Sequence, residues 1–309
     1  MKYLLQFLKV VLLIGSFVFI GYKLINTFNI NERYLDFVVL YQPKSLFYFF
    51  LAFSLMFLNI SLEVKKWMVL LKPYEQFTFK ESASAVVSGI ALSIVTPNQI
   101  GDFAGRVLNL NKLAKLKGAL LAVIGYTAQV LTTIVFGLFA YWRLVLSKAD
   151  LPGLTAILCF FAAILSVFIF FNFQLLSPLL NKFRFLKKYE ESINVFKEQK
   201  SGLLLNVLIL SVVRFCTYLV QFWLLLKFFQ VEISAFDAFS AIISTFFVQS
   251  FVPSFLLLEL GLRGSAAIWF IGMFSSNIPG ILLASYTLWI INMLIPALYG
   301  YFIIYKIKT

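Results

Sequence analysis

The sequence predicts an all-α polytopic membrane protein with six full spans, two re-entrant broken-helix hairpins and two inverted repeats. Hydrophobic residues make up 61% of the 309 residues, charged residues 13%, and the mean hydropathy is +0.94. A soluble domain is nearer half apolar and about a quarter charged. The apolar residues form runs of about 20, the length that crosses a bilayer. Two runs are interrupted by proline, glycine and paired charges, and the two interruptions resemble each other.

The full spans are predicted at 3–25, 45–66, 118–141, 153–175, 202–228 and 280–305. No small-x-small cleavage site follows the first span, so we expect an uncleaved helix rather than a removed signal peptide. The net charge is +13, and its basic residues concentrate in loops such as 182–200. Because basic loops stay in the cytoplasm, both termini are expected there, with the protein in a bacterial plasma (inner) membrane.

The first interruption, 96–108, reads Thr-Pro-Asn-Gln-Ile-Gly-Asp-Phe-Ala-Gly-Arg-Val-Leu. The apolar stretch 82–97 before it would cover about 24 Å as a helix, short of the roughly 30 Å hydrocarbon core. Lysines flank the stretch on both sides, so we predict a re-entrant hairpin over 82–116 with its tip near 97–101. Pro97 removes a backbone donor, and Gly101 and Gly105 let another backbone come close.

The second interruption lies in the apolar segment 238–276, with Pro253 and Gly261 at the break. The two halves of the chain match at an offset of 156 residues, which pairs these sites in order: Trp67 with Trp223, Ser84–Ser88 with Ser240–Ser244, and Pro97 with Pro253. The second span then corresponds to the fifth. Because a shift by an odd number of spans reverses the direction of crossing, the two halves would be inverted in the membrane relative to each other, as in many transporters. We predict one transmembrane domain, 1–309, with repeat 1 at about 44–142 and repeat 2 at about 200–305.

Charged residues at the interruptions are the candidate site, because ionisable groups in apolar segments are costly and usually functional. Asp102 and Arg106 are four residues apart, and so are their counterparts in the second half. Each pair would share a helical face. The arginines of these pairs could bind a phosphate group, because a guanidinium donates two parallel hydrogen bonds to phosphate oxygens. The predicted substrate-binding residues are Asn98, Gln99, Asp102, Arg106, Arg214, Glu259 and Arg263.

Arg214 lies near the middle of the span 202–228, so it should face the protein interior and find a carboxylate, for which we expect Glu259. The alternative for Arg214 and for both pairs is a purely structural role, as salt bridges that fix the hairpins. Trp67, Trp142 and Trp223 are expected at the membrane interface, near span ends.

Several function classes are disfavoured by what the sequence contains. There is no histidine, and the two cysteines, Cys159 and Cys216, lie inside apolar spans, so no metal site is expected. No Gly-rich phosphate loop or nucleophile–base set is visible, so we expect no cofactor, no catalytic residue and no enzymatic activity. The basic residues form no continuous patch, so a nucleic-acid partner is not expected. A homo-oligomer is left open.

The motif from Thr96 to Asp102, together with Pro253 and the segment Glu259-Leu-Gly-Leu-Arg-Gly264, resembles the lysylphosphatidylglycerol synthase transmembrane, or flippase-like, family. Family members carry a first-half Pro followed by Gly-acid and a second-half Pro followed by Gly-x-Arg. The family often has its second acid directly after the arginine, where this chain has Gly264. The resemblance implies a stand-alone transmembrane member without the aminoacyl-transferase domain.

The function expected from these residues and this resemblance is lipid translocation. A phospholipid or lipid-linked head group would move between leaflets through a central polar cavity, while its tails stay in the membrane. Two rivals remain open: a membrane-embedded enzyme of lipid or glycolipid modification, and an accessory factor that holds partner enzymes. An enzyme would need a catalytic acid or base beyond the two charged pairs.

Overall fold

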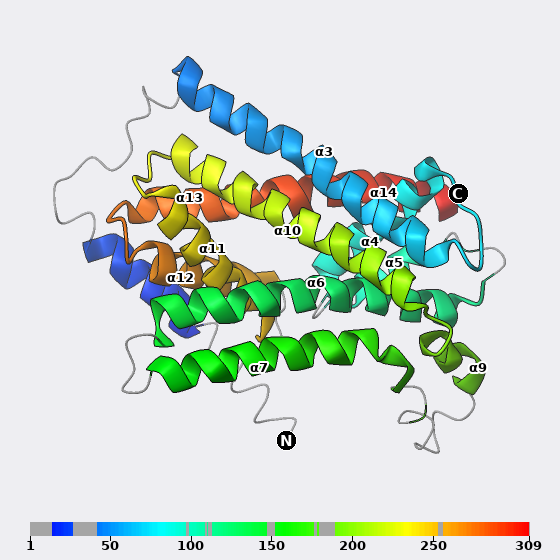
Figure 1. Ribbon diagram of the computed structural model, residues 1–309. Coiled ribbons are helices and arrows are strands. Elements are labelled where there is room, and N and C mark those ends of the chain that lie inside the picture. Colours follow the sequence, from blue (N-terminus) through cyan, green and yellow to red (C-terminus); the bar gives the residue numbers. More distant parts are fainter. Residues whose placement is uncertain are drawn as a thin grey trace.

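The computed structural model describes residues 14–26, 42–96, 99–108, 110, 113–146, 152–175, 178, 189–252 and 256–308. The regular elements in these ranges are all helices, arranged as an elongated bundle (Figure 1). Three residues assigned to the predicted hairpin breaks or the binding set, Pro97, Asn98 and Pro253, lie outside the described ranges.

Five described segments are long and apolar enough to cross a membrane. They are α3 (Pro43–Leu71), α6 (Lys115–Leu144), α7 (Pro152–Phe171), α10 (Ser201–Phe228) and the segment Ile278–Lys306. Each corresponds to one predicted span, with ends that differ by a few residues. The predicted first span is described only in part, as the helix Ile14–Asn26, so its full length is not tested.

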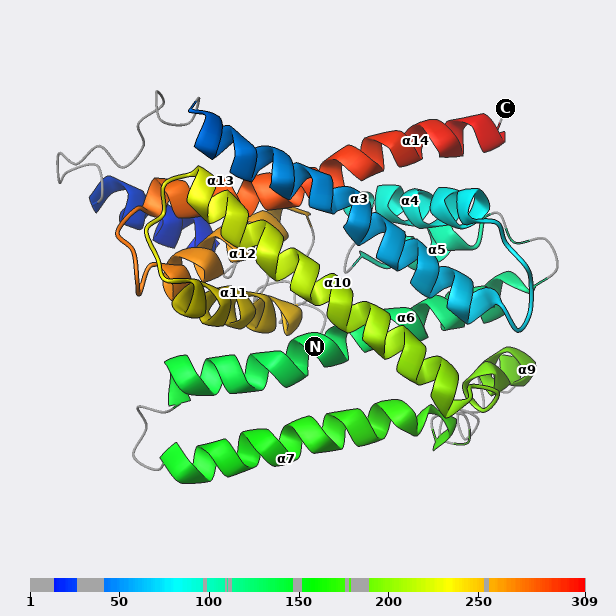
Figure 2. The ribbon, with the colours of Figure 1, turned by 45° about the horizontal axis from the view of Figure 1, so that its top comes forward.

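The antiparallel pair α3 and α10 crosses the bundle side by side (Figures 1 and 2). Polar bonds join the two helices deep in the bundle: the Gln221 amide donates to the Ala52 carbonyl at 2.8 Å and receives a bond from Asn59 at 3.4 Å. Asn292 bonds both Asn59 and Gln221, at 3.1 and 2.9 Å. Such bonds hold membrane helices together where lipid is as apolar as leucine.

The predicted first break is confirmed as an interruption between two helices. α4 (Phe79–Val95) starts with a capping box, in which Thr78 accepts the Glu81 N–H and the Glu81 carboxylate accepts the Thr78 N–H. α4 ends at Val95, and a short helix, α5 (Gly101–Arg106), follows.

Thr96 satisfies the backbone at this break. Its hydroxyl donates to the Leu92 carbonyl at 2.9 Å and accepts the Gly101 N–H at 2.7 Å. Gln99, between the two helices, adopts φ 55°, a left-handed conformation uncommon outside glycine. The described residues on either side of the interruption, Thr96, Gln99 and Gly101, thus find backbone partners in the protein, which lipid could not supply.

Close backbone packing holds α5 against α4. A Cβ added at Gly105 would lie 2.5 Å from the Ser88 carbonyl oxygen and 2.6 Å from the Gly89 Cα. A Cβ at Gly101 would collide with the Leu92 carbonyl. The two predicted glycines thus have the close-approach role that small residues play between membrane helices.

The second broken segment forms α11 (Ala235–Ser250) and α12 (Leu256–Ile271). Ser234 caps α11 by accepting the Asp237 N–H at 3.2 Å. Gly261 of α12 packs against Ser16 of the first described helix. Figures 1 and 2 show α4 and α5 at one end of the bundle and α11 and α12 at the opposite end.

The last membrane-long segment is bent rather than uniform. α13 (Ile278–Trp289) passes into a π-helical turn, η6 (Ile290–Leu294), and then into α14 (Ile295–Lys308). Pro296 has no N–H to offer the preceding turn, which is consistent with the wider spacing there. The turn brings Asn292 into the polar contact with α3 and α10 described above.

Short elements cover the end of the bundle that carries α4 and α5. They are α9 (Glu190–Ile193) and η5 (Asn194–Phe196), while η3 (Phe173–Leu175) follows α7. Next to them the Tyr74 hydroxyl donates to the Glu198 carboxylate at 2.7 Å, and Lys117 lies 2.9 Å from the same carboxylate. Burial and the Glu198 carboxylate raise the pKa of Tyr74. These contacts fasten the loop after α3 to the segment before α10.

The interfacial role expected for Trp67 is wrong. Its side chain is fully buried, and the Arg106 guanidinium lies 5.8 Å from its ring centroid. Trp142 and Trp223 are partly exposed. The prediction for Trp67 failed because α3 continues past the predicted span end at residue 66 to Leu71, so Trp67 lies within the helix rather than at its end.

Replacing Gly105 with alanine should destabilise the protein, because the backbone atoms that its Cβ would meet cannot move aside as a side chain can. Overpacking of this kind costs about 1–3 kcal/mol. The measurement is the midpoint of thermal unfolding in detergent. Gly202→Ala is the matched control, since nothing lies within 4 Å of its added Cβ. Equal midpoints for the two variants would contradict the packing described here.

Candidate functional site

A cavity of about 270 Å³, with several charged side chains in its lining, lies between the two broken segments. Helices from both halves of the chain line it, together with the π-helical turn η6. Its charged lining residues are Glu63 and Lys66 of α3, Asp102 and Arg106 of α5, Arg214 of α10, and Glu259 and Arg263 of α12. Its uncharged polar lining includes Ser93, Gln99, Tyr126, Gln129, Thr133, Tyr218, Gln249, Ser250, Trp289 and Asn292.

Glu63 is the carboxylate that joins most of these charges. Its Oε1 lies 2.8 Å from Arg106, and its Oε2 lies 2.8 Å from Lys66 and 3.0 Å from Arg214. The Glu63 side chain is 6% exposed. A buried charge is tolerated only when it is paired, and here one carboxylate serves three cations from three helices.

Arg106 is held from two directions. In addition to Glu63 it binds Asp102, with Nε and Nη2 each 2.9 Å from the same Asp102 oxygen. This contact confirms the predicted pairing of Asp102 with Arg106. Because both ends of its guanidinium are occupied by carboxylates, Arg106 has little capacity left for a ligand.

Arg214 makes a different contact from the one predicted. Its ion pair is with Glu63, not Glu259, and Gln129 and Tyr218 add weaker contacts at 3.4 and 3.5 Å. The expected partner is wrong because Glu63, on the neighbouring antiparallel helix α3, lies nearer. The pairing of Arg214 with an interior carboxylate is confirmed.

Arg263 and Glu259 form the second predicted pair, which is also confirmed. Arg263 Nη2 lies 2.9 Å from Glu259 Oε1, and each side chain is 17% exposed. Among the described residues one carboxylate binds Arg263, whereas two bind Arg106. Of the two arginines predicted in acid–arginine pairs, Arg263 is therefore the more available to a ligand.

The lining of this cavity has more positive than negative side chains, and several of its hydrogen-bond donors have no acceptor within the described part of the chain. Four cationic side chains face three carboxylates among the lining residues, so the lining carries one net positive charge when all are ionised. Several buried donors have no acceptor among the described residues: Arg214 Nε, Arg263 Nε, Gln249 Nε2 and Trp289 Nε1. Buried donors without partners cost free energy. The cavity is thus suited to an anion that accepts hydrogen bonds.

The structure brings together most of the site residues predicted from sequence. Asp102, Arg106, Arg214, Glu259 and Arg263 all line the cavity, and so does Gln99. Their use in substrate binding stays a prediction. Sequence reasoning missed Glu63 and Lys66, although Glu63 lies inside the predicted span 45–66. The rule that selected Arg214, a charge within an apolar span, selects Glu63 as well.

Comparison with known proteins identifies a family. The family model that describes the lysylphosphatidylglycerol synthase TM region matches residues 6–300. No match was found among curated proteins or among solved structures.

Replacing Glu63 with glutamine should destabilise the protein strongly, because three buried cations would lose their common partner. Breaking a buried ion pair from one side costs about 3–5 kcal/mol. Thermal unfolding in detergent measures the loss, and Glu232→Gln, an exposed residue, is the control.

The double variant Glu63→Gln/Lys66→Met should recover part of this stability, because it also removes the most deeply buried of the three cations. A double variant as unstable as Glu63→Gln alone would show that Lys66 is not paired as described. An unaffected Glu63→Gln variant would exclude the central role of this carboxylate.

Proposed function

The chain belongs to the lysylphosphatidylglycerol synthase TM family, and from this membership we propose that it moves a phospholipid or lipid-linked head group between the leaflets of the membrane. It is a multi-pass membrane protein of a family concerned with lipid handling. The step we add is translocation itself, through the cavity between the two broken segments.

The excess of cations and unpartnered donors in the cavity carries this proposal. A phosphodiester head group has one negative charge and several acceptor oxygens, which is the complement of the lining. Arg263 and Arg214 would bind the phosphate, because each has a buried Nε without an acceptor among the described residues. Arg106 would mainly hold Glu63 and Asp102 in place.

Inverted repeats would give this cavity access from both sides. α4 and α11 start at residues 79 and 235, an offset of 156, and their caps Thr78 and Ser234 show the same offset. The α4–α5 and α11–α12 segments lie at opposite ends of the bundle (Figure 1). We propose that they are re-entrant hairpins entering from opposite faces, an arrangement that transporters use to alternate access to one central site.

Orientation follows from charge in this proposal. The end of the bundle with α4 and α5 also carries Lys72, Lys80, Lys115 and Lys117. By the positive-inside rule this end would face the cytoplasm of a bacterial inner membrane, with both termini on that side. The head group would pass through the cavity while its acyl chains remain in lipid.

Transport is preferred to catalysis because the cavity's charged side chains are already committed to one another. Glu63, Asp102 and Glu259 each bind an arginine, and the sequence has no histidine to act as a general base. Lipid extracts from a deletion strain separate the two activities. Unchanged lipid species with an altered leaflet distribution are expected, whereas a missing or new species would favour an enzyme.

Arg263→Gln should slow translocation of a labelled phospholipid in reconstituted liposomes by about tenfold or more, since a hydrogen bond to a charged group is worth about 1.5–3 kcal/mol. Arg143→Gln is the matched control, because Arg143 also pairs with a carboxylate, Asp237 at 2.7 Å, but does not line the cavity. Equal rates for Arg263→Gln and wild type would remove the assigned role. The same outcome would favour the accessory-factor alternative.

A further inference from the structure

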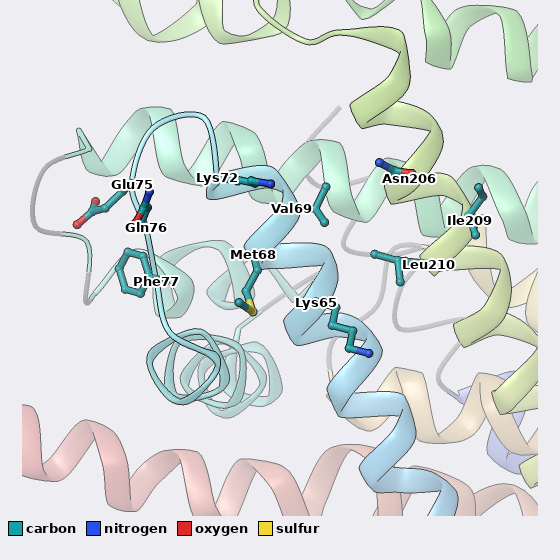
Figure 3. Close-up of a pocket in the computed structure, with 10 residues that line it drawn as sticks. All are labelled: Lys65, Met68, Val69, Lys72, Glu75, Gln76, Phe77, Asn206, Ile209 and Leu210. Atoms are coloured by element: carbon teal, nitrogen blue, oxygen red, sulfur yellow. The ribbon is translucent and has the colours of Figure 1, made fainter.

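We propose that a groove between α3 and α10, separate from the central cavity, binds one anionic phospholipid. The groove has a volume of about 680 Å³, larger than that of the central cavity. It lies where the C-terminal part of α3 meets the N-terminal part of α10 (Figure 3). This proposal goes beyond transport and does not depend on it.

Two lysines make the groove positive. Lys65 and Lys72 are seven residues apart, two helical turns, so they share a face of α3. Both are exposed, and neither forms an ion pair with a described residue. Figure 3 shows both amino groups directed to the side of α3 on which α10 lies.

The carboxylate of the lining does not neutralise these lysines. Glu75 is buried and accepts the Leu113 N–H at 3.2 Å. In Figure 3 it lies on the loop after α3, on the side of that helix away from Asn206. The lysine side of the groove therefore keeps a net positive charge and an adjacent amide, that of Asn206.

Apart from Gln76, the rest of the groove is apolar. Val69 of α3 faces Ile209 and Leu210 of α10, and Ile209 is 50% exposed (Figure 3). Free phosphate would use the lysines but would leave this surface uncovered. A phospholipid satisfies both parts, because its phosphate pairs with the amino groups while an acyl chain covers the apolar residues.

The position of Lys65 adds a reason for such a ligand. It lies within α3, one of the membrane-long helices, six residues before the helix ends at Leu71. A lysine in the last turns of a membrane-long helix extends its amino group to the head-group region, where lipid phosphates lie. A phospholipid in the groove would place its phosphate beside that amino group.

The groove and the central cavity are separated by α3 itself. Lys65 lines the groove, whereas the next residue, Lys66, is 2% exposed and binds Glu63 in the cavity. On α10, Leu210 lines the groove and Arg214, one turn later, lines the cavity. A lipid in the groove is therefore distinct from a head group in the cavity.

Native mass spectrometry of the purified protein, titrated with phosphatidylglycerol, tests this site. Lys65→Gln/Lys72→Gln should bind one phosphatidylglycerol at least about tenfold more weakly than wild type, since each lysine near an anionic lipid contributes about 1 kcal/mol. Lys80→Gln/Lys115→Gln removes the same charge from exposed positions outside the groove and should bind as wild type does. Phosphatidylcholine should not fill the site.

Ile209→Trp tests the apolar half without changing charge, and it should also weaken binding of this lipid. Arg263→Gln, which alters only the central cavity, should bind phosphatidylglycerol in the groove as wild type does. The proposal is overturned if the groove variants hold phosphatidylglycerol as wild type does, or if inorganic phosphate displaces the lipid at equal concentration. None of these outcomes requires transport activity.

Discussion

The ion cluster around Glu63 is the interaction on which the rest of the structure depends. One buried carboxylate binds cations from α3, α5 and α10, and so joins a long antiparallel pair to the short helix after the first break. In a medium of low dielectric constant, removing this carboxylate would leave Lys66 and Arg214 without their buried ionic partner, at a cost of several kcal/mol. The cluster therefore fixes where α5 sits, and with it one wall of the cavity.

The hydrogen-bonding requirement of the backbone explains the form of the breaks. A helix that stops among apolar surroundings exposes carbonyl and N–H groups that lipid cannot bind. Thr96 bonds both sides of the first break. Gly101 and Gly105 then let α5 pack directly on α4. At the described positions of this break, one threonine and two glycines therefore allow the chain to leave α4 and pack back on it with the Thr96 and Gly101 backbone groups paired.

Much of this arrangement could be predicted from the sequence, because charge and proline stand out in a chain that is 61% hydrophobic. The helix pairs Asp102–Arg106 and Glu259–Arg263 follow from a spacing of four residues, which is local information. The partner of Arg214 could not be obtained in this way. Glu63 is 151 residues away in the sequence, and only the packing of α3 against α10 brings the two together.

The groove also could not be predicted from the sequence, because the adjacent lysines 65 and 66 look alike there, as one basic flank of a span. The structure divides them between two surfaces of the same helix. This division restricts how the molecule can change shape. Turning α3 about its axis by one residue, about 100°, would drag Lys66 out of its ion cluster toward lipid. In the proposed transport, α3 would therefore keep its rotation about its own axis, and the moving parts would be the short helices beside it.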